Sequence, residues 1–573
     1  MSFAGEEISQ RMDCAPLKAP SSACYEDQKS TVVQKLTTVD LNSTRSVRPQ
    51  TVHVEVQLKC FSVASPDLVS QQVQVFLRQR GICNVPLLID FFQEAVDVRA
   101  DPACSGVNST SENLQEFMRE NIAAINLVTD CSNCSVGSDL GIAVDLQSAP
   151  LTFHIYHLVT GDEADPTHET IEVSNEVIKG GTRWLLPSAE FDGLWESLVY
   201  DTSVKRDLLN YSESALVFAD YKVNPHVISW NRVIFLHGPP GTGKTSLCRA
   251  LAQKLAIRLS HRFSSAALIE INTVNLMSKW FSESARLVSQ MFNSIFEYLE
   301  VADHLVCLLV DEVESLTSVR KSTAAACEPS DAIRVVNAVL THLDQLKRYP
   351  NVLVMATSNV TGVLDPAFLD RADIRAYIGP PSPVAIYAIY CSCLNELIRV
   401  GLIERQKTSL LSHRALMAFQ FVENQVTAAS LAVWRVAMRS AGLNGRTLRK
   451  LPLLAHAFYL DKIVNPPYEV SRLPEALDFM PQAYKENLAP GTVPPTATPV
   501  QQAPSLLRFV AAMQCAVEAQ FADRSLLEEV AADTSAGQRV GTSTGPTPQQ
   551  QPSNSSEPVG RSTQTIQTAV HLL

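Results

Sequence analysis

Four short and largely apolar runs limit what the middle of this chain can fold into. They are VIFL at 233–236, LIEIN at 268–272, LVCLLV at 305–310 and VLVMAT at 352–357. Apolar strands of this kind are buried on both faces of a sheet, and the amphipathic stretches between them supply covering helices. Residues 225–380 are therefore predicted to form an α/β domain with a parallel sheet flanked by helices.

The loop after the first run carries the strongest chemical signal. It reads GPPGTGKT, follows a strand and opens directly into the helix-like SLCRALAQKL. In this strand–loop–helix setting the G-x-x-x-x-G-K-T pattern binds nucleotide phosphates through backbone N–H groups, with the lysine on the outer phosphates and the threonine on Mg²⁺. A glycine-rich turn without a ligand is disfavoured, because pattern and setting agree. The predicted cofactor-binding residues are Gly238, Pro239, Pro240, Gly241, Thr242, Gly243, Lys244 and Thr245.

Polar residues also end two of the other predicted strands. Asp311 and Glu312 follow LVCLLV, and Asn359 follows VLVMAT. An aspartate at this edge can hold Mg²⁺, a glutamate beside it can act as general base on a water, and an amide can orient that water. An acidic pair could otherwise belong to a turn, but the upstream phosphate loop favours a hydrolytic site.

The rest of the chain divides by composition. Alternating valines at 52–58, a helical pattern at 66–80 and a strand at 151–158 predict a small mixed α/β domain, with a loop near 101–138. His154 and His157 are expected on the solvent face of that strand. The predicted organisation is a disordered leader at 1–50, an N-terminal domain at 51–180, a linker at 181–224, the parallel-sheet domain at 225–380, a helical lid at 381–531 with a Pro/Thr-rich insertion at 487–504, and a disordered tail at 532–573.

Charge and cysteine usage exclude several classes of protein. The formal net charge of −12 opposes non-specific binding to nucleic acid or an anionic membrane. The chain has no long apolar run, and glutamates stand where a signal peptide needs basic residues. Thirteen irregularly spaced cysteines indicate reduced thiols, and the lone Cys131-Ser-Asn-Cys134 motif is a weak metal signal.

Longer stretches make the assignment more specific. These stretches are HGPPGTGKTSLCRALAQKL, SKWFSESARLV, LVDEVESLTSVR, EPSDAIRVVNAVLTHLDQLKR, DPAFLDRADIRAYIGPPS and GLNGRTLRKLPLLAHAFY. They resemble the corresponding segments of the pachytene checkpoint protein 2 family of AAA+ P-loop ATPases. The resemblance implies an ATP- and Mg²⁺-dependent homohexamer that converts HORMA-domain proteins from closed to open forms, working through a HORMA-like adaptor. It further implies roles in the spindle checkpoint and in meiotic chromosomes, and a location in the nucleus, at chromosomes and kinetochores, and in the cytoplasm, without direct contact to nucleic acid or membrane.

The same resemblance assigns roles to single residues. Asp311 and Glu312 correspond to the Walker B pair and Asn359 to sensor 1. Arg446 in GLNGR corresponds to sensor 2, while the arginine finger is Arg371 or, four residues on, Arg375.

An aromatic pair in polar surroundings is the remaining feature. Trp280 and Phe281 follow Lys279 in SKWFSESAR, and in the resembled family this segment is the pore loop that grips an extended client chain. Burial in a core is the alternative, but the segment lacks an apolar period.

Other functions remain open on the sequence alone. The chain could remodel a different protein client, such as a SNARE complex or a protease partner, or act as a nucleotide-dependent scaffold without turnover. Glu312, Asn359 and Arg446 disfavour the scaffold, and the acidic balance disfavours DNA translocation.

Overall fold

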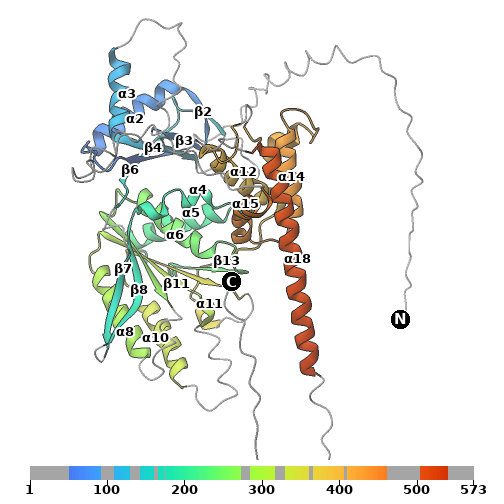
Figure 1. Ribbon diagram of the computed structural model, residues 1–573. Coiled ribbons are helices and arrows are strands. Elements are labelled where there is room, and N and C mark those ends of the chain that lie inside the picture. Colours follow the sequence, from blue (N-terminus) through green and yellow to red (C-terminus); the bar gives the residue numbers. More distant parts are fainter. Residues whose placement is uncertain are drawn as a thin grey trace, which may run out of the picture. The chain divides into compact units, whose positions relative to one another are not determined.

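The computed structural model describes residues 51–91, 109–129, 142–160, 166–173, 176–272, 284–315, 330–360, 366–405, 409–460 and 504–539. The predicted leader, nearly all of the insertion at 487–504, the motif at 131–134 and residues 540–573 lie outside these ranges. The chain divides into two units, Met1–Ala385 with Ser412–Ala415, and Ile386–Leu411 with Leu416–Leu573 (Figure 1). Each unit is described separately.

A four-stranded sheet forms the N-terminal part of the first unit. Its order is β3-β4-β1-β6, with β1 antiparallel to β4 and parallel to β6. Helices α2 and α3 pack on one face, where Val52, Val54 and Val56 are buried against Val69 and Val73. The elements are β1 (Val52–Leu58), α2 (Pro66–Arg80), β2 (Ile82–Val85), β3 (Leu87–Asp90), α3 (Ser109–Asn121), β4 (Ile122–Thr129), β5 (Ile142–Asp145) and β6 (Leu151–His157).

Two expectations for this domain were wrong. The segment 101–138, expected to be a loop, contains α3 and the central strand β4. Polar residues around Leu114 and Met118 conceal the helical spacing, although both side chains are buried in the core. His154 is also buried, with 5% of its surface exposed, because a second domain covers the face of β6 that the sequence assigned to solvent. His157 is exposed as expected.

A seven-stranded sheet forms the rest of the first unit in the described part of the chain. The order is β13-β9-β12-β11-β10-β8-β7, and the strands from β13 to β10 are parallel. All four apolar runs form strands of this sheet. The strands are β7 (Thr167–Val173), β8 (Glu176–Leu186), β9 (Val233–His237), β10 (Ser265–Asn272), β11 (His304–Asp311), β12 (Val352–Ser358) and β13 (Ile374–Tyr377).

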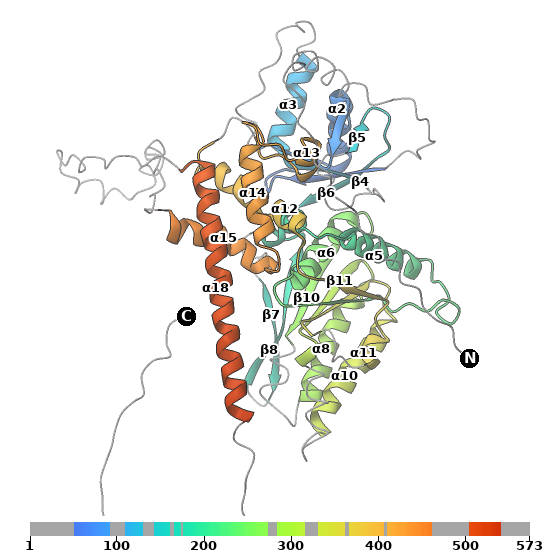
Figure 2. The same ribbon diagram turned by 90° about the vertical axis from the view of Figure 1, so that its right-hand side faces the viewer.

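Helices cover both faces of this sheet, as Figure 2 shows. One core contains apolar residues of α5 (Val204–Asp220) and α6 (Lys244–Arg258). The other contains those of α8 (Ser284–Leu299) and α10 (Ser330–Leu346). A fold with a buried parallel sheet between two helical layers was predicted and is confirmed.

The seven-stranded sheet begins earlier in the sequence than expected. β8 pairs antiparallel with β10, and β7 pairs antiparallel with β8, so both strands extend the parallel sheet. The boundary drawn at residue 180 therefore falls inside β8. This boundary could not be predicted from the pattern of residues, because edge strands of mixed sheets need no continuous apolar run.

The second unit is helical. It contains α14 (Ala428–Arg439), α15 (Gly445–Tyr459), α18 (Leu506–Arg539), most of α12 (Pro383–Arg399) and the second half of α13 (His413–Ala418), in agreement with the predicted lid. α18 packs on α14 and α15 through buried Leu506, Phe509 and Met513.

The last helix is longer than predicted. α18 continues to Arg539, whereas residues from 532 on were expected to be disordered. Glu528, Glu529, Ala531 and Ala532 are good helix formers, and propagation adds a hydrogen bond for each residue once a helix exists.

Candidate active site

The phosphate loop joins the buried strand β9 to helix α6. Gly238, Gly241 and Gly243 have positive φ angles of 147°, 78° and 90°, where a β-carbon is strained. A β-carbon at Gly238 would lie 2.1 Å from the carbonyl oxygen of Ile378. The turn therefore requires glycine for both conformation and close approach.

The loop presents an anion-binding geometry. No side chain caps the N-terminus of α6, whose first residue is Lys244. Uncapped N–H groups at a helix start attract phosphate, and the helix dipole adds to this attraction. The Lys244 Nζ donates to the carbonyl oxygens of Gly238 and Pro239, 2.9 Å from each, so the ammonium group lies across the loop. These donors fit a nucleotide phosphate.

A tyrosine outside the motif supports the loop. The Tyr200 hydroxyl donates to the carbonyl oxygen of Gly243 at 3.1 Å. A β-carbon on Gly243 would lie 2.9 Å from that hydroxyl oxygen. Tyr200 was not predicted from the sequence, because it precedes Gly243 by 43 residues and belongs to no nucleotide-binding pattern.

Asp311 faces the start of α6 from the end of β11. The Thr245 hydroxyl donates to its carboxylate, 3.0 Å from Oδ1 and 3.2 Å from Oδ2. A hydroxyl and a carboxylate, together with phosphate oxygens and water, are the usual ligands of Mg²⁺ at nucleotide sites. Thr245 and Asp311 would hold such a divalent ion, which would neutralise phosphate charge.

Thr357 links both acidic residues, and its role was not predicted. Its hydroxyl donates to Oδ1 of Asp311 and accepts the backbone N–H of Glu312 at 3.3 Å. Its carbonyl oxygen accepts the N–H of Val313 at 3.0 Å. Glu312 has φ of 55°, which is unusual for a residue with a side chain, and Thr357 holds the backbone on both sides of it.

Asn359 lies one residue beyond the end of β12 and is held by Glu314, three residues beyond the end of β11. Its backbone N–H donates to Oε1 of Glu314 at 3.0 Å. Because β12 and β11 are parallel neighbours, Asn359 and the Asp311–Glu312 pair emerge at the same edge of the sheet. The structure thus brings together the residues predicted for phosphate binding, metal binding and water activation.

The electrostatic surroundings favour an anionic ligand. Burial, and then the nearby Lys244, hold the pKa of His237 below its ordinary value, so this imidazole is neutral at physiological pH. Within the described ranges, no group of three or more His, Cys, Asp or Glu residues is placed to hold a metal ion.

The two candidate arginine fingers differ in their contacts. Arg371 forms a bidentate pair with Asp344, at 3.1 Å and 2.7 Å, and donates to the Ala367 carbonyl oxygen at 2.6 Å. Burial opposes ionisation of Asp344, but hydrogen bonds from Arg371 and Lys347 outweigh it and hold the pKa of this carboxyl below its ordinary value.

Arg375 is about half exposed, lies 3.7 Å from Asp370 and donates to the Leu369 carbonyl oxygen at 2.6 Å. The choice between the two arginines therefore stays a prediction.

The remaining predicted residues do not belong to the described part of the first unit. Arg446 is exposed in the first turn of α15, in the second unit. Lys279, Trp280 and Phe281 lie outside the described residues, so the pore loop also stays a prediction.

Comparison with known proteins agrees with this site. Residues 234–380 match the family model for ATPases associated with various cellular activities, and residues 382–487 match the TRIP13-like AAA+ ATPase lid C-terminal domain. The pachytene checkpoint protein 2 homolog of Homo sapiens is 45% identical over 410 residues, 72% of this chain and 88% of that protein. The Gallus gallus homolog is 56% identical over 317 residues, 55% of this chain and 72% of that protein.

A solved structure is also similar. C. elegans PCH-2 is 26% identical, with a TM-score of 0.58 over 82% of this chain and 100% of that one. The fold, the phosphate loop and the acidic strand end define an AAA+ ATPase, an enzyme that binds nucleotide with a divalent metal. Within that class the chain belongs to the pachytene checkpoint protein 2 family. None of the helices in the described ranges is long and apolar enough to cross a bilayer.

Proposed function

We propose that this ATPase uses ATP and Mg²⁺ to convert HORMA-domain proteins from closed to open forms, as a homohexamer that recruits its clients through a HORMA-like adaptor. Its expected setting is the spindle checkpoint and the meiotic chromosome axis, in the nucleus and the cytoplasm. Membership of the family supports the client class.

The single observation that carries the proposal is the arrangement at the end of β11. Thr245, Asp311, Glu312 and Asn359 converge at one edge of the sheet next to the phosphate loop. A scaffold without turnover needs phosphate contacts but no positioned base. Here Thr357 holds the backbone of Glu312 in an unusual conformation, which favours an enzyme that hydrolyses ATP over a scaffold that only binds it.

A conversion assay tests the proposal. Purified full-length protein is incubated with ATP, Mg²⁺ and a closed HORMA-domain protein, with and without an adaptor, and the open form is separated by ion exchange. We expect ATP-dependent conversion that ADP does not support and that Glu312→Gln abolishes. ATP turnover without any conversion, with or without adaptor, would point to a different protein client.

Assembly is tested separately. Sedimentation of the Glu312→Gln protein with ATP should give a hexamer, and tagged protein should be found in nucleus and cytoplasm. A monomer at micromolar concentration with ATP bound would contradict the ring.

A further inference from the structure

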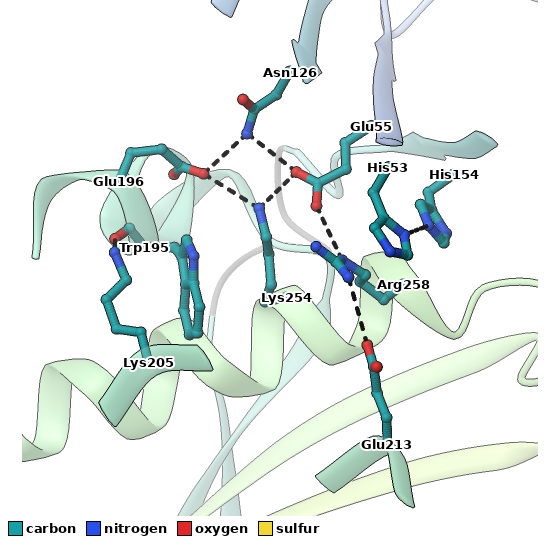
Figure 3. Close-up of polar contacts among 10 residues, drawn as sticks. All are labelled: His53, Glu55, Asn126, His154, Trp195, Glu196, Lys205, Glu213, Lys254 and Arg258. Atoms are coloured by element: carbon teal, nitrogen blue, oxygen red, sulfur yellow. Dashed lines mark hydrogen bonds and ion pairs between the residues drawn. The ribbon is translucent and has the colours of Figure 1, made fainter. Parts of the chain in front are cut away.

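A cluster of buried charges joins the N-terminal sheet to the helix of the phosphate loop. Glu55 on β1 is 2% exposed, and Lys254 and Arg258 on α6 are each 3% exposed. The Lys254 Nζ lies 2.6 Å from Oε2 of Glu55, and the Arg258 Nε lies 3.4 Å from Oε1 (Figure 3). Each oxygen of one buried carboxylate thus faces a buried cation.

Nearby carboxylates support the cluster but are less well placed to replace Glu55. Glu196 lies 3.3 Å from Lys254 and Glu213 lies 3.8 Å from Arg258, with side chains 49% and 32% exposed. Solvent screens charges at such positions. An uncompensated charge in a protein interior is costly, so the two cations depend mainly on Glu55.

Asn126 fixes the orientation of Glu55. Its Nδ2 donates to Oε2 of Glu55 and to Oε1 of Glu196, at 3.1 Å each (Figure 3). Asn126 lies on β4, directly opposite Glu55 in the antiparallel pair. Two neighbouring strands of the N-terminal domain therefore contribute to the same contact.

The cations lie at one end of α6 and the phosphate loop at the other. α6 begins at Lys244 and ends at Arg258, and nearly all of its residues are buried. At about 1.5 Å of rise per residue its 15 residues span roughly 22 Å, and packed secondary elements of this kind can carry coupling between two sites. A displacement of its last turn can therefore be transmitted to the first turn, where the nucleotide phosphates are bound.

A cavity adjoins the contact between the two domains. This cavity of about 310 Å³ lies beside the cluster, lined in part by Glu55, Asn126, Tyr156, Trp195 and Lys254. Close packing would make separation of the domains expensive, and this cavity lowers that cost. Buried ion pairs also add specificity of geometry more than net stability.

We propose that Glu55 is a positioning residue for the ATPase. Glu55 docks the N-terminal domain on α6 and thereby couples this docking to nucleotide binding. Coupling between two sites is reciprocal, so nucleotide must change docking by the same factor by which docking changes nucleotide affinity. The inference depends on the ATPase site and not on which client the enzyme acts on.

Hydrogen exchange on the full-length protein tests the coupling. Exchange is followed in segments 52–58 and 122–129 with and without a slowly hydrolysed ATP analogue, and nucleotide affinity is measured with fluorescent ADP. The variant is Glu55→Gln. The matched control is Glu116→Gln, which removes the same charge from an exposed position on α3 of the same domain.

The wild type and Glu116→Gln should show a nucleotide-dependent change of protection in both segments. Glu55→Gln should lose this dependence and change nucleotide affinity by about five-fold or more, the lower end of typical coupling factors. A purely structural role predicts lower protection with the nucleotide effect retained. That outcome, or no nucleotide effect in the wild type, overturns the proposal.

A second variant covers the case in which Glu55→Gln does not fold. Asn126→Ala keeps every charge of the cluster but removes the hydrogen bond that orients Glu55. It should fold and weaken the nucleotide-dependent change by a smaller factor. In a double-mutant cycle of Asn126→Ala with Lys254→Met, effects on nucleotide affinity that simply add would overturn the coupling.

Discussion

Thr357 shows how one buried hydroxyl can organise a hydrolytic site. It is 1% exposed and contacts the carboxylate of Asp311 and the backbone of Glu312, the two acidic residues to which sequence analysis gave different tasks. Glu314, three residues beyond the end of β11, likewise accepts the backbone N–H of Asn359. The geometry at this edge therefore depends on residues other than those predicted to bind nucleotide and metal.

Replacing Thr357 by valine should slow ATP hydrolysis. The methyl group fills the space, but Asp311 loses a donor and the Glu312 N–H loses its acceptor, a cost of about 1–3 kcal/mol in stability. Loss of groups that orient metal ligands typically lowers activity about 10- to 100-fold, and we expect kcat to fall within that range. Thr357→Ser keeps the hydroxyl and should stay near wild type, and equal damage by both variants would contradict this role.

Replacing Glu312 by glutamine should separate binding from hydrolysis. The phosphate loop is unchanged, so nucleotide should bind with near wild-type affinity, while loss of a general base typically costs about 10²- to 10⁴-fold in rate. Phosphate release and fluorescent-nucleotide binding measure the two properties. Turnover close to wild type would rule Glu312 out as the base.

Among the elements, β1 and β6 show why face assignments from alternation can fail. Glu55 on β1 and His154 on β6 are opposite each other in the parallel pair, and both are buried. The alternation of polar and apolar residues along a strand predicts one solvent-exposed face for an isolated sheet. The ATPase domain covers that face with α6, so its polar residues become a buried, paired surface.

His154 should make the folded protein sensitive to acid. Burial, with the neighbouring His53 and Arg258, lowers the pKa of His154 from 6.5 to about 4, and His261 acts in the same direction while Glu55 opposes it. The unfolded chain therefore binds more protons than the folded chain between these pKa values, and the free energy of unfolding decreases as pH falls from 6.5 towards 4. At about 1.4 kcal/mol per unit the loss approaches about 3 kcal/mol.

Thermal melting between pH 7.5 and 4.5 measures this effect. His154→Gln should reduce the pH dependence, whereas His157→Gln, on an exposed site of the same strand, should not. Identical pH profiles for wild type and His154→Gln would show that His154 does not titrate as described.

At the scale of the whole molecule, the residues predicted for hydrolysis and those predicted to grip a client belong to different segments. The described hydrolytic residues lie on β11, β12 and the start of α6. The segment 279–281, predicted to grip the client, lies outside the described residues. The charge cluster at Glu55 is a third region, and through it the N-terminal domain contacts helix α6 of the ATPase domain.

Trp280→Ala should therefore uncouple turnover from remodelling. If Trp280 faces the channel of a ring, basal ATP turnover and the melting temperature should stay near wild type while client conversion is lost. If Trp280 is instead packed in a core, truncation should cost about 3–5 kcal/mol and damage every activity together. Melting, basal ATPase and conversion on one preparation distinguish the two, and unchanged conversion would contradict the pore-loop assignment.

The sequence by itself determined the ATPase fold and predicted the main site residues. Continuous apolar strands such as 305–310 can be stable only between two helical layers, and GPPGTGKT has a local conformation that its glycines impose. Both are properties of short segments, so they can be read without knowing the rest of the chain.

Only the tertiary structure decided which distant residues meet. Tyr200 supports Gly243, Thr357 joins Asp311 to Glu312, and Glu55 compensates Lys254 across about two hundred positions of sequence. None of these residues stands out locally, because a tyrosine, a threonine or a glutamate fits a solvated surface equally well. Their roles arise from burial between packed domains, where an unpaired polar group or charge is costly and a partner is therefore required.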